Sequence, residues 1–267
     1  MTSKTFSALK SHSELFSLSG KTAAVIGGGG HVCSALAKGF AAAGANVAII
    51  DLRIEKAENI AEEISIEYGV KTIGLYADAT NLNELNSVME SLMQFTQKID
   101  IAVNGGGINS SKPFLEIGES DWHKVVDSQL TATFFGCQVF GKHMLANANG
   151  SIINISSASA DPALSKAYAY SAAKAGIRNL TQNLGREWGQ SGVRVNAIRP
   201  GFFPTEWNRK NFITPEREAA ILSHTPMNRF GETTELIGAA IYLASSASSF
   251  VTGSELIVDG GFSAMTI

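Results

Sequence analysis

The sequence carries little charge and has no excess of either sign. Of its 267 residues 17% are charged, and 21 lysine and arginine residues stand against 24 aspartate and glutamate residues, which gives a net charge of −3. Binding to nucleic acid or to an anionic membrane surface depends on an excess of cationic side chains that neutralise phosphates. The composition therefore argues against both kinds of partner.

Cysteine is scarce, and long hydrophobic runs are absent. The two cysteines, Cys33 and Cys137, lie far apart without a metal-ligand spacing, so we expect neither a disulfide framework nor a metal site. No apolar run approaches the ~18 residues of a membrane span, and residues 1–19 lack the apolar core of a signal peptide. We expect a cytoplasmic protein in which residues 1–19 form a polar extension.

The rest of the sequence is rich in apolar residues and glycine. Hydrophobic residues make up 45% of the chain and glycine contributes 26 residues, which is typical of a globular, turn-rich domain. From Lys21 onward, short β-rich runs alternate with longer segments of helical period, the pattern of a parallel sheet joined by crossover helices. We expect one α/β domain over residues 20–267, with about seven parallel strands and helices on both faces of the sheet.

Most of the predicted strands are continuous apolar runs, as expected of strands that are buried on both faces. They are Thr22–Ile26, Val47–Asp51, Lys71–Tyr76, Ile99–Asn104, Gly150–Ser156, Val193–Arg199 and Glu255–Val258. The predicted helices are Ser34–Ala43, Ile54–Tyr68, Leu82–Gln97, Asp121–Ala146, Ala167–Gly189 and Glu235–Ala244.

One stretch, residues 201–229, breaks the alternation of strands and helices. It contains three prolines, follows the sixth predicted strand and carries several charged side chains. Ligands of open α/β sheets bind beyond the carboxyl ends of the strands, so a long polar insertion there indicates a lid over a substrate. A solvated surface loop is the alternative interpretation.

A glycine-rich turn and an acidic residue indicate a dinucleotide site. Gly27–Gly30 lie between the first predicted strand and a helix, and Asp51 follows 24 positions after Gly27, at the end of the second strand. Glycines let the backbone approach a pyrophosphate, the helix N-terminus offers free N–H groups, and the carboxylate accepts a hydrogen bond from a ribose hydroxyl. A purely structural turn, with Asp51 as a strand-end residue, is the alternative.

Asp51 also bears on which cofactor binds. Its carboxylate repels the 2′-phosphate of NADP at short range, which favours NAD. Arg53 lies two positions further on and keeps NADP as the alternative, because a guanidinium can pair with that phosphate.

Ser157, Tyr170 and Lys174 suggest acid–base chemistry. Tyr170 and Lys174 are four positions apart, on one face of a predicted helix, and Ser157 lies thirteen positions before Tyr170. A tyrosine with a pKa near ~10 is a poor acid–base group at neutral pH, but an adjacent ammonium lowers that pKa, and a serine hydroxyl can hold the substrate oxygen. An incidental pair is the alternative. Tyr168 lacks a cationic partner, since Ala172 stands four positions after it.

Together these motifs resemble the short-chain dehydrogenase/reductase family over residues 15–267. The similarity rests on the turn from Gly27, Asp51, Asp78 in Ala-Asp-Ala-Thr, Asn104-Gly105-Gly106-Gly107, Ser157, Tyr170-x-x-x-Lys174, Pro200-Gly201, Thr205 and Asp259-Gly260-Gly261. The resemblance implies a Rossmann-type, doubly wound fold, NAD(P)-dependent interconversion of an alcohol and a ketone, and a homotetramer. The two longest predicted helices are also apolar enough to suit a symmetric interface.

The resemblance further implies roles for individual residues. Ser157, Tyr170 and Lys174 are expected to be catalytic. Gln129 joins them because it aligns with the family's usual asparagine, whose backbone carbonyl holds a water molecule that leads to the lysine. The expected cofactor-binding residues are Gly27, Gly29, Gly30, His31, Val32, Asp51, Leu52, Asp78, Ala79, Asn104, Gly105, Gly106, Tyr170, Lys174, Pro200, Gly201, Phe203 and Thr205.

Three sites depart from the family pattern. His31 and Cys33 replace the second and third glycines of the first motif, Gly105-Gly106 stands where Asn-Ala is usual, and Gln129 replaces the asparagine. We interpret Cys33 as a residue that packs the helix against the sheet, with a reactive thiol as the alternative. His31 either adds a donor near the pyrophosphate or marks a reduced affinity for the dinucleotide.

The loops around the predicted lid resemble those of family members that act on sugar acids and polyols, such as mannonate or fructuronate oxidoreductases. We therefore expect a small-molecule substrate with a secondary alcohol, most simply a polyol, a sugar or a sugar acid. A 3-oxoacyl thioester or another ketone is the alternative substrate, and a dinucleotide-binding regulatory protein on the same fold is the non-enzyme alternative. The expected substrate residues are Ser159, Asn109, Glu206, Asn208 and Arg209, with Lys210, His224 and Arg229 as further cations for a carboxylate.

Overall fold

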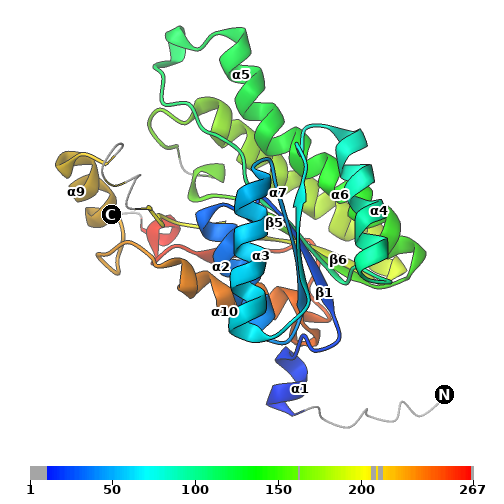
Figure 1. The fold of residues 1–267 in the computed structure, drawn as a ribbon. Helices are drawn as coiled ribbons and strands as arrows, with labels where there is room; N and C mark the ends of the chain where they lie inside the picture. The colour runs from blue at the N-terminus through cyan, green and yellow to red at the C-terminus, as the bar shows by residue number, and fades with distance from the viewer. Residues whose placement is uncertain (1–10, 162, 206–208, 210–212, 266–267) are drawn as a thin grey trace, which may run out of the picture.

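The computed structural model describes residues 11–161, 163–205, 209 and 213–265. Within them, seven strands form one parallel sheet in the order β3-β2-β1-β4-β5-β6-β7. Figure 1 shows the sheet among its helices, with β1, β5 and β6 labelled. The predicted α/β, Rossmann-type fold is confirmed. The strands are β1 (Thr22–Ile26), β2 (Asn46–Asp51), β3 (Thr72–Tyr76), β4 (Ile101–Asn104), β5 (Gly150–Ile155), β6 (Val193–Pro200) and β7 (Glu255–Val258).

The central strands are hydrophobic on both faces because helices cover both faces of the sheet. In β1, Ala23 and Val25 belong to one hydrophobic core, whereas Ala24 and Ile26 belong to the other. Side chains alternate between the faces of a strand, so a continuous apolar run is what a doubly covered sheet needs.

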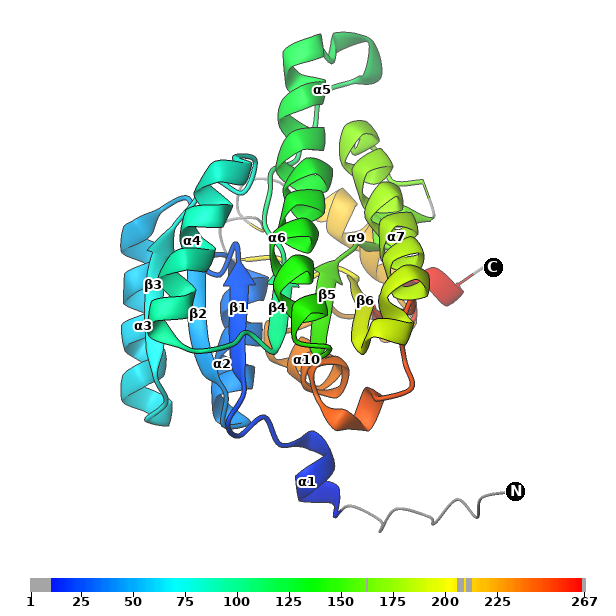
Figure 2. The ribbon, with the colours of Figure 1, turned by 90° about the vertical axis from the view of Figure 1, so that its right-hand side faces the viewer.

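Helices pack on both faces of the sheet, as Figure 2 shows. The first face carries α2 (His31–Ala42), α3 (Ile54–Tyr68) and α10 (Ile237–Ala244). The second face carries α4 (Leu82–Phe95), α6 (Ala132–Ala146) and α7 (Tyr168–Trp188).

The helix predicted over residues 121–146 is a rod of three consecutive segments. α5 (Glu119–Val126) is followed by a π-helical turn, Asp127–Thr131, and then by α6. Figure 2 shows α5 continuing beyond the edge of the sheet. A π-helical turn inside a helix often lies at a functional site, and this one contains Gln129.

Two further helices lie in segments for which the sequence predicted none. α1 (His12–Phe16) begins with a capping box, in which Ser11 and Glu14 each satisfy the other's backbone N–H. Leu18 follows it and is fully buried in the first core, so the segment packs on the domain. In the predicted lid, α9 (Pro215–Ser223) starts at Thr214, whose side chain accepts from a backbone N–H. None of the helices in the described ranges is long and apolar enough to cross a membrane.

The sheet order reverses between β1 and β4, and this reversal places the site. Asp51 ends β2, Asn104 ends β4, Ser157 comes two positions after β5, and Pro200 ends β6. Because all seven strands are parallel, these carboxyl ends share one edge of the sheet. Doubly wound sheets bind ligands at such an edge, next to the reversal.

Candidate active site

The side chain of Lys174 joins the catalytic helix to the sheet. Lys174 is only 3% exposed, and its ammonium donates a hydrogen bond of 2.6 Å to the backbone carbonyl of Ile155, the last residue of β5. The ammonium also lies over the ring of Tyr170, 5.4 Å from the ring centroid. Sequence reasoning missed Ile155, because a backbone acceptor leaves no signal in the residue type.

Ser157 lies beside Tyr170, as the predicted triad requires. Its backbone is extended, and its hydroxyl accepts hydrogen bonds from the N–H of Ser159 at 3.2 Å and from the hydroxyl of Ser159 at 3.1 Å. A further hydrogen bond joins Ser157 to the phenol of Tyr170. Ser159 is buried, so its hydroxyl orients Ser157, and the substrate contact predicted for it stays a prediction.

The protonation of this triad differs from the expectation. Burial raises the pKa of Tyr170 above its ordinary value, and the hydrogen bond from Ser157 is the opposing contribution. Lys174 is not among the groups that shift this pKa; its ammonium lies over the ring and donates to the Ile155 carbonyl. Burial lowers the pKa of Lys174 to about 8. The phenol is therefore neutral at neutral pH, which is the form that can donate a proton.

The glycine-rich turn, Gly27–Gly30, leaves a space beside its backbone that a side chain would fill, and we call this space the cradle. Gly27 has a φ of +71°, in the left-handed region, and a Cβ there would overlap the backbone of Gly105. A Cβ on Gly29 would press against the carboxylate of Asp51. The next residue, Gly30, caps α2, which begins at His31 and directs its first N–H groups towards the turn. The turn thus suits the close approach of a pyrophosphate, as predicted.

Asp51 is held at the end of β2 by three donors. Its carboxylate accepts from the N–H of Gly29 at 3.0 Å, from the N–H of Arg53 at 3.0 Å and from the guanidinium of Arg53 at 3.2 Å. Leu52, between them in the chain, is exposed. A carboxylate fixed beside the turn matches the position needed for a ribose hydroxyl.

Cys33 packs against the loop that follows β4. A Cβ on Gly105 would overlap the sulfur of Cys33, so the thiol occupies the space that a side chain at position 105 would need. Burial raises the pKa of Cys33 to about 12. The thiol therefore stays protonated at neutral pH, and the packing interpretation holds against the reactive one.

Gln129 reaches the same loop from the π-helical turn. Its side-chain amide donates to the backbone carbonyl of Ile108 at 3.0 Å, and a Cβ on Gly107 would overlap that amide. Its own backbone carbonyl accepts from the hydroxyl of Thr133 at 2.7 Å. Gln129 thus fixes the loop after β4 through its side chain. The resemblance to the family had implied a role only for its backbone carbonyl.

Asn104 and Asp78 shape the strand ends that border the predicted cofactor site. Asn104 is buried, and its amide donates to Asn154 of β5 at 2.9 Å. Asp78 lies beyond the end of β3 and accepts from the backbone N–H and the hydroxyl of Thr80. Asp78 thus holds local backbone in place, whereas Asn104 joins the side chains at the ends of β4 and β5.

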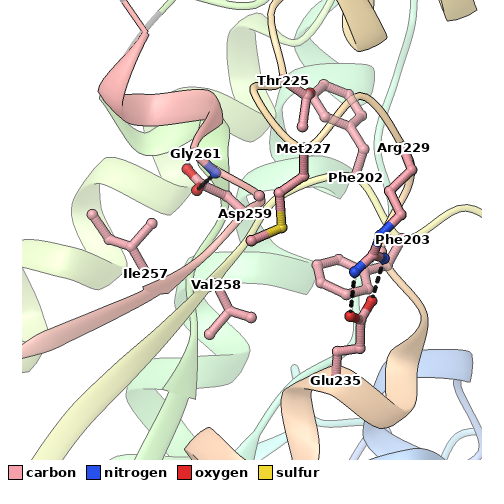
Figure 3. Close-up of a pocket in the computed structure, with 12 residues that line it drawn as sticks. Phe202, Phe203, Thr225, Met227, Arg229, Glu235, Ile257, Val258, Asp259 and Gly261 are labelled. Carbon is pink, nitrogen blue, oxygen red and sulfur yellow. Dashed lines mark hydrogen bonds and ion pairs between the residues drawn. The ribbon is translucent and has the colours of Figure 1, made fainter.

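The lid region encloses a cavity of about 400 Å³ beside β7 (Figure 3). Phe202, Phe203 and Met227 contribute to its lining, and none of the four predicted catalytic side chains does. The cavity also contains Arg229, which forms a two-pronged ion pair with Glu235 at 2.6 and 2.7 Å (Figure 3). Arg229 thus pairs with Glu235 in this structure, and the role predicted for it towards a substrate carboxylate stays a prediction.

The remaining predicted substrate residues are only partly placed. Glu206, Asn208 and Lys210 lie outside the described residues. The guanidinium of Arg209 lies over the ring of Phe230, 4.9 Å from its centroid, and Asn109 is exposed beside the loop after β4. His224 instead packs edge-on against Phe262.

The chain is similar to known oxidoreductases over most of its length. Residues 31–263 match the family model described as Enoyl-(Acyl carrier protein) reductase. Gluconate 5-dehydrogenase of Gluconobacter oxydans (strain 621H) is 34% identical over 251 residues, which cover 94% of this chain and 98% of that protein. The oxidoreductase UxuB of Bacillus subtilis (strain 168), described as uncharacterized, is 36% identical over 268 residues, which cover 92% of this chain and 96% of UxuB.

A solved structure is also similar to this chain over most of its length. The crystal structure of a gluconate 5-dehydrogenase from Burkholderia cenocepacia J2315, in complex with NADP and tartrate, superposes with a TM-score of 0.91. The two chains are 33% identical, and the match covers 95% of this chain and 99% of that one. The chain belongs to the short-chain dehydrogenase/reductase family, whose members are NAD(P)-dependent oxidoreductases that act on CH–OH groups.

Replacing Tyr170 tests its predicted role. Because general acid–base catalysis contributes roughly 10²–10⁴-fold, we expect Tyr170→Phe to lower kcat at least about a hundredfold while the cofactor still binds. The measurement is steady-state kinetics together with cofactor fluorescence titration. Tyr168→Phe is the matched control, since Tyr168 is partly exposed and packs edge-on against Phe114. Equal damage from both variants would refute the assignment.

Proposed function

We propose that this protein is an NAD-dependent oxidoreductase that interconverts a secondary alcohol and a ketone on a sugar acid, a sugar or a polyol. The observation that carries the proposal is the meeting of Ser157, Tyr170 and Lys174 at one edge of the sheet. Relatives that are 34% identical over at least 92% of this chain support the substrate class. They are named gluconate 5-dehydrogenase, D-threitol dehydrogenase and galactitol 2-dehydrogenase.

The three side chains divide the work of the reaction. In reduction, Ser157 donates a hydrogen bond to the ketone oxygen and Tyr170 gives its phenol proton to that oxygen as it becomes a hydroxyl. In oxidation, Tyr170 takes the proton back from the alcohol. A nicotinamide bound beside these residues would supply or accept the hydride. Lys174 anchors α7 to β5. The N–H donors of its ammonium that the Ile155 carbonyl does not use would hold the ribose.

The residues at the predicted cofactor site fit a dinucleotide. The cradle at Gly27 and Gly29 and the N-terminus of α2 suit the pyrophosphate, and Asp51 suits a ribose diol. The crystal structure from Burkholderia cenocepacia contains NADP, so at least one relative binds the phosphorylated cofactor. We favour NAD for this chain because Asp51 points its charge at the turn, and a 2′-phosphate there meets a carboxylate.

A second candidate substrate is a 3-oxoacyl thioester. The observation in its favour is the matching family model, whose description names an acyl carrier protein reductase. Sugar-acid and polyol substrates remain the better-supported class, because the full-length relatives carry those names. Asn109, Ser159 and Arg209 are the described residues that we propose for the substrate's hydroxyl and carboxylate groups. Assembly as a homotetramer is also proposed.

Absorbance of the reduced nicotinamide tests the substrate class directly. We expect NADH formation with an aldonate such as gluconate, or with a four- to six-carbon polyol, and NADH consumption with the corresponding keto sugar acid. The panel also contains an acetoacetyl thioester and simple secondary alcohols, and Tyr170→Phe is the control for contaminating activity. Turnover of the thioester alone would reject the sugar-acid and polyol proposal.

Cofactor choice is tested by paired kinetics. We expect NAD to exceed NADP in kcat/KM by at least about tenfold, or about 1.4 kcal/mol, because the Asp51 carboxylate repels the additional phosphate. Asp51→Ser is expected to narrow the gap, while Glu63→Ser serves as an acidic-residue control, because Glu63 is exposed and pairs with Lys38. Equal use of the two cofactors by the unaltered protein would contradict the preference.

A further inference from the structure

Four charged side chains form a closed ring of ion pairs at the loop between β5 and α7, the loop that carries Ser157. Asp161 pairs with Arg178 at 3.4 Å and with Arg199 at 3.5 Å, and Glu255 pairs with the same two arginines at 3.6 and 3.3 Å. The charges alternate around the ring and sum to zero. No other role assigned to this chain uses these residues.

The ring connects four parts of the proposed site. Asp161 lies four positions after Ser157 on the loop between β5 and α7. Arg178 lies on α7, four positions after Lys174, and therefore on the same face of that helix. Arg199 precedes Pro200 on β6, and Glu255 begins β7. The ring thus ties the loop that carries Ser157 to the helix that carries Tyr170.

Burial changes steadily around the ring. The side chain of Arg199 is 3% exposed, that of Glu255 is 12% exposed, and that of Asp161 is 60% exposed. Only one nitrogen of the buried Arg199 guanidinium is paired, and the other two have no hydrogen-bond partner in the described part of the chain. A buried cation needs its counter-charges, so the ion pairs with Arg199 and Arg178 hold Asp161, the most exposed residue of the ring, in place.

Few other polar contacts fix this loop. For residues 158–161 and 163–167, the side-chain hydrogen bonds and ion pairs to other elements in the described structure are the ion pairs of Asp161 and one 3.4 Å hydrogen bond from Arg217 to Ser165. Ser159 points back to Ser157. Ala158 packs as a buried residue at the start of the loop, and Asp161 provides the ion pairs that tie its far end to α7 and β6.

We propose that Asp161 is a positioning residue, which keeps Ser157 in hydrogen-bond contact with Tyr170 and with the substrate oxygen by anchoring the loop to Arg178 and Arg199. The inference rests on the proposed function, because it assigns Asp161 a task in that reaction. Asp161 acts through Ser157 and touches no reacting atom. A displacement of about 1 Å in a catalytic group can cost up to ~10²-fold in rate, so an exposed ion pair can matter to catalysis while contributing little to global stability.

A double-mutant cycle tests whether Asp161 works through Ser157. The proteins are the unaltered chain, Asp161→Asn, Ser157→Ala and the double variant, assayed with the best substrate of the panel. We expect Asp161→Asn to lower kcat about tenfold and to raise the substrate KM, with the NAD KM within about twofold of the original value. In the Ser157→Ala background the same change is expected to alter kcat by less than about twofold.

Three further variants separate positioning from folding. Asp161→Glu restores the charge and is expected to recover kcat to within about threefold, and Arg178→Gln is expected to reproduce the kinetics of Asp161→Asn. Glu63→Gln is the matched control, because Glu63 is 56% exposed and pairs with Lys38 on the other face of the sheet. It is expected to leave kinetics unchanged. Thermal unfolding of every variant reports on stability.

The outcomes separate this inference from the proposed function. If the unaltered protein turns over no substrate of the panel, the proposed function itself fails. If Ser157→Ala leaves activity intact, the oxidoreductase function stands, and the roles of Ser157 and of Asp161 acting through it are overturned. If Ser157→Ala is inactive or nearly so while Asp161→Asn behaves like the unaltered protein, the proposed function stands and the positioning role of Asp161 is overturned. Equal losses from Asp161→Asn in both backgrounds, or loss of Tm with unchanged kinetics, also overturn it.

Discussion

The hydrogen bond from the buried ammonium of Lys174 to the carbonyl of Ile155 is the interaction on which the site depends. It fixes one turn of α7 against the end of β5. Ser157 is two residues beyond that carbonyl, and Tyr170 is one turn before the lysine, so the same bond brings the hydroxyl and the phenol together. Burial of a charged amine is costly without a partner, and the lowered pKa of Lys174, about 8, reflects that cost.

The loop after β4 shows how the departures from the family pattern fit one another. Cys33 is larger than the usual glycine, and it lies where a side chain at Gly105 would be. Gln129 is longer than the usual asparagine, and its amide lies where a side chain at Gly107 would be. The bulky residues and the glycines are therefore complementary. The departures reshape the walls of the site and leave Ser157, Tyr170 and Lys174 in place.

The sequence predicted the sheet because its physical signal is local. Continuous apolar runs mark strands buried on both faces, and every predicted strand boundary falls within two residues of the structure. The pairing of Tyr170 with Lys174 was also predictable, since helix periodicity brings positions four apart together. The substrate class entered through resemblance of loops, and Glu206 and Asn208 lie outside the described residues.

Contacts between distant segments were not predictable in this way. The ring of Asp161, Arg178, Arg199 and Glu255 joins residues up to 94 positions apart, and no spacing rule relates them. The pKa of Tyr170 was misjudged for a similar reason. Periodicity placed Lys174 beside it, but the direction of the ammonium depends on the Ile155 carbonyl, a backbone group from another element.

The central claim is that the phenol of Tyr170 is the proton donor and acceptor. The most direct measurement is the pH dependence of kcat/KM in both directions of the reaction. Oxidation needs the phenolate, so its kcat/KM is expected to rise with pH up to the pKa of Tyr170, which burial places above the ordinary value. Reduction needs the neutral phenol, so its kcat/KM is expected to fall as pH rises through the same pKa. Profiles of the same sign in both directions, or profiles that keep this shape after Tyr170→Phe, would contradict the account.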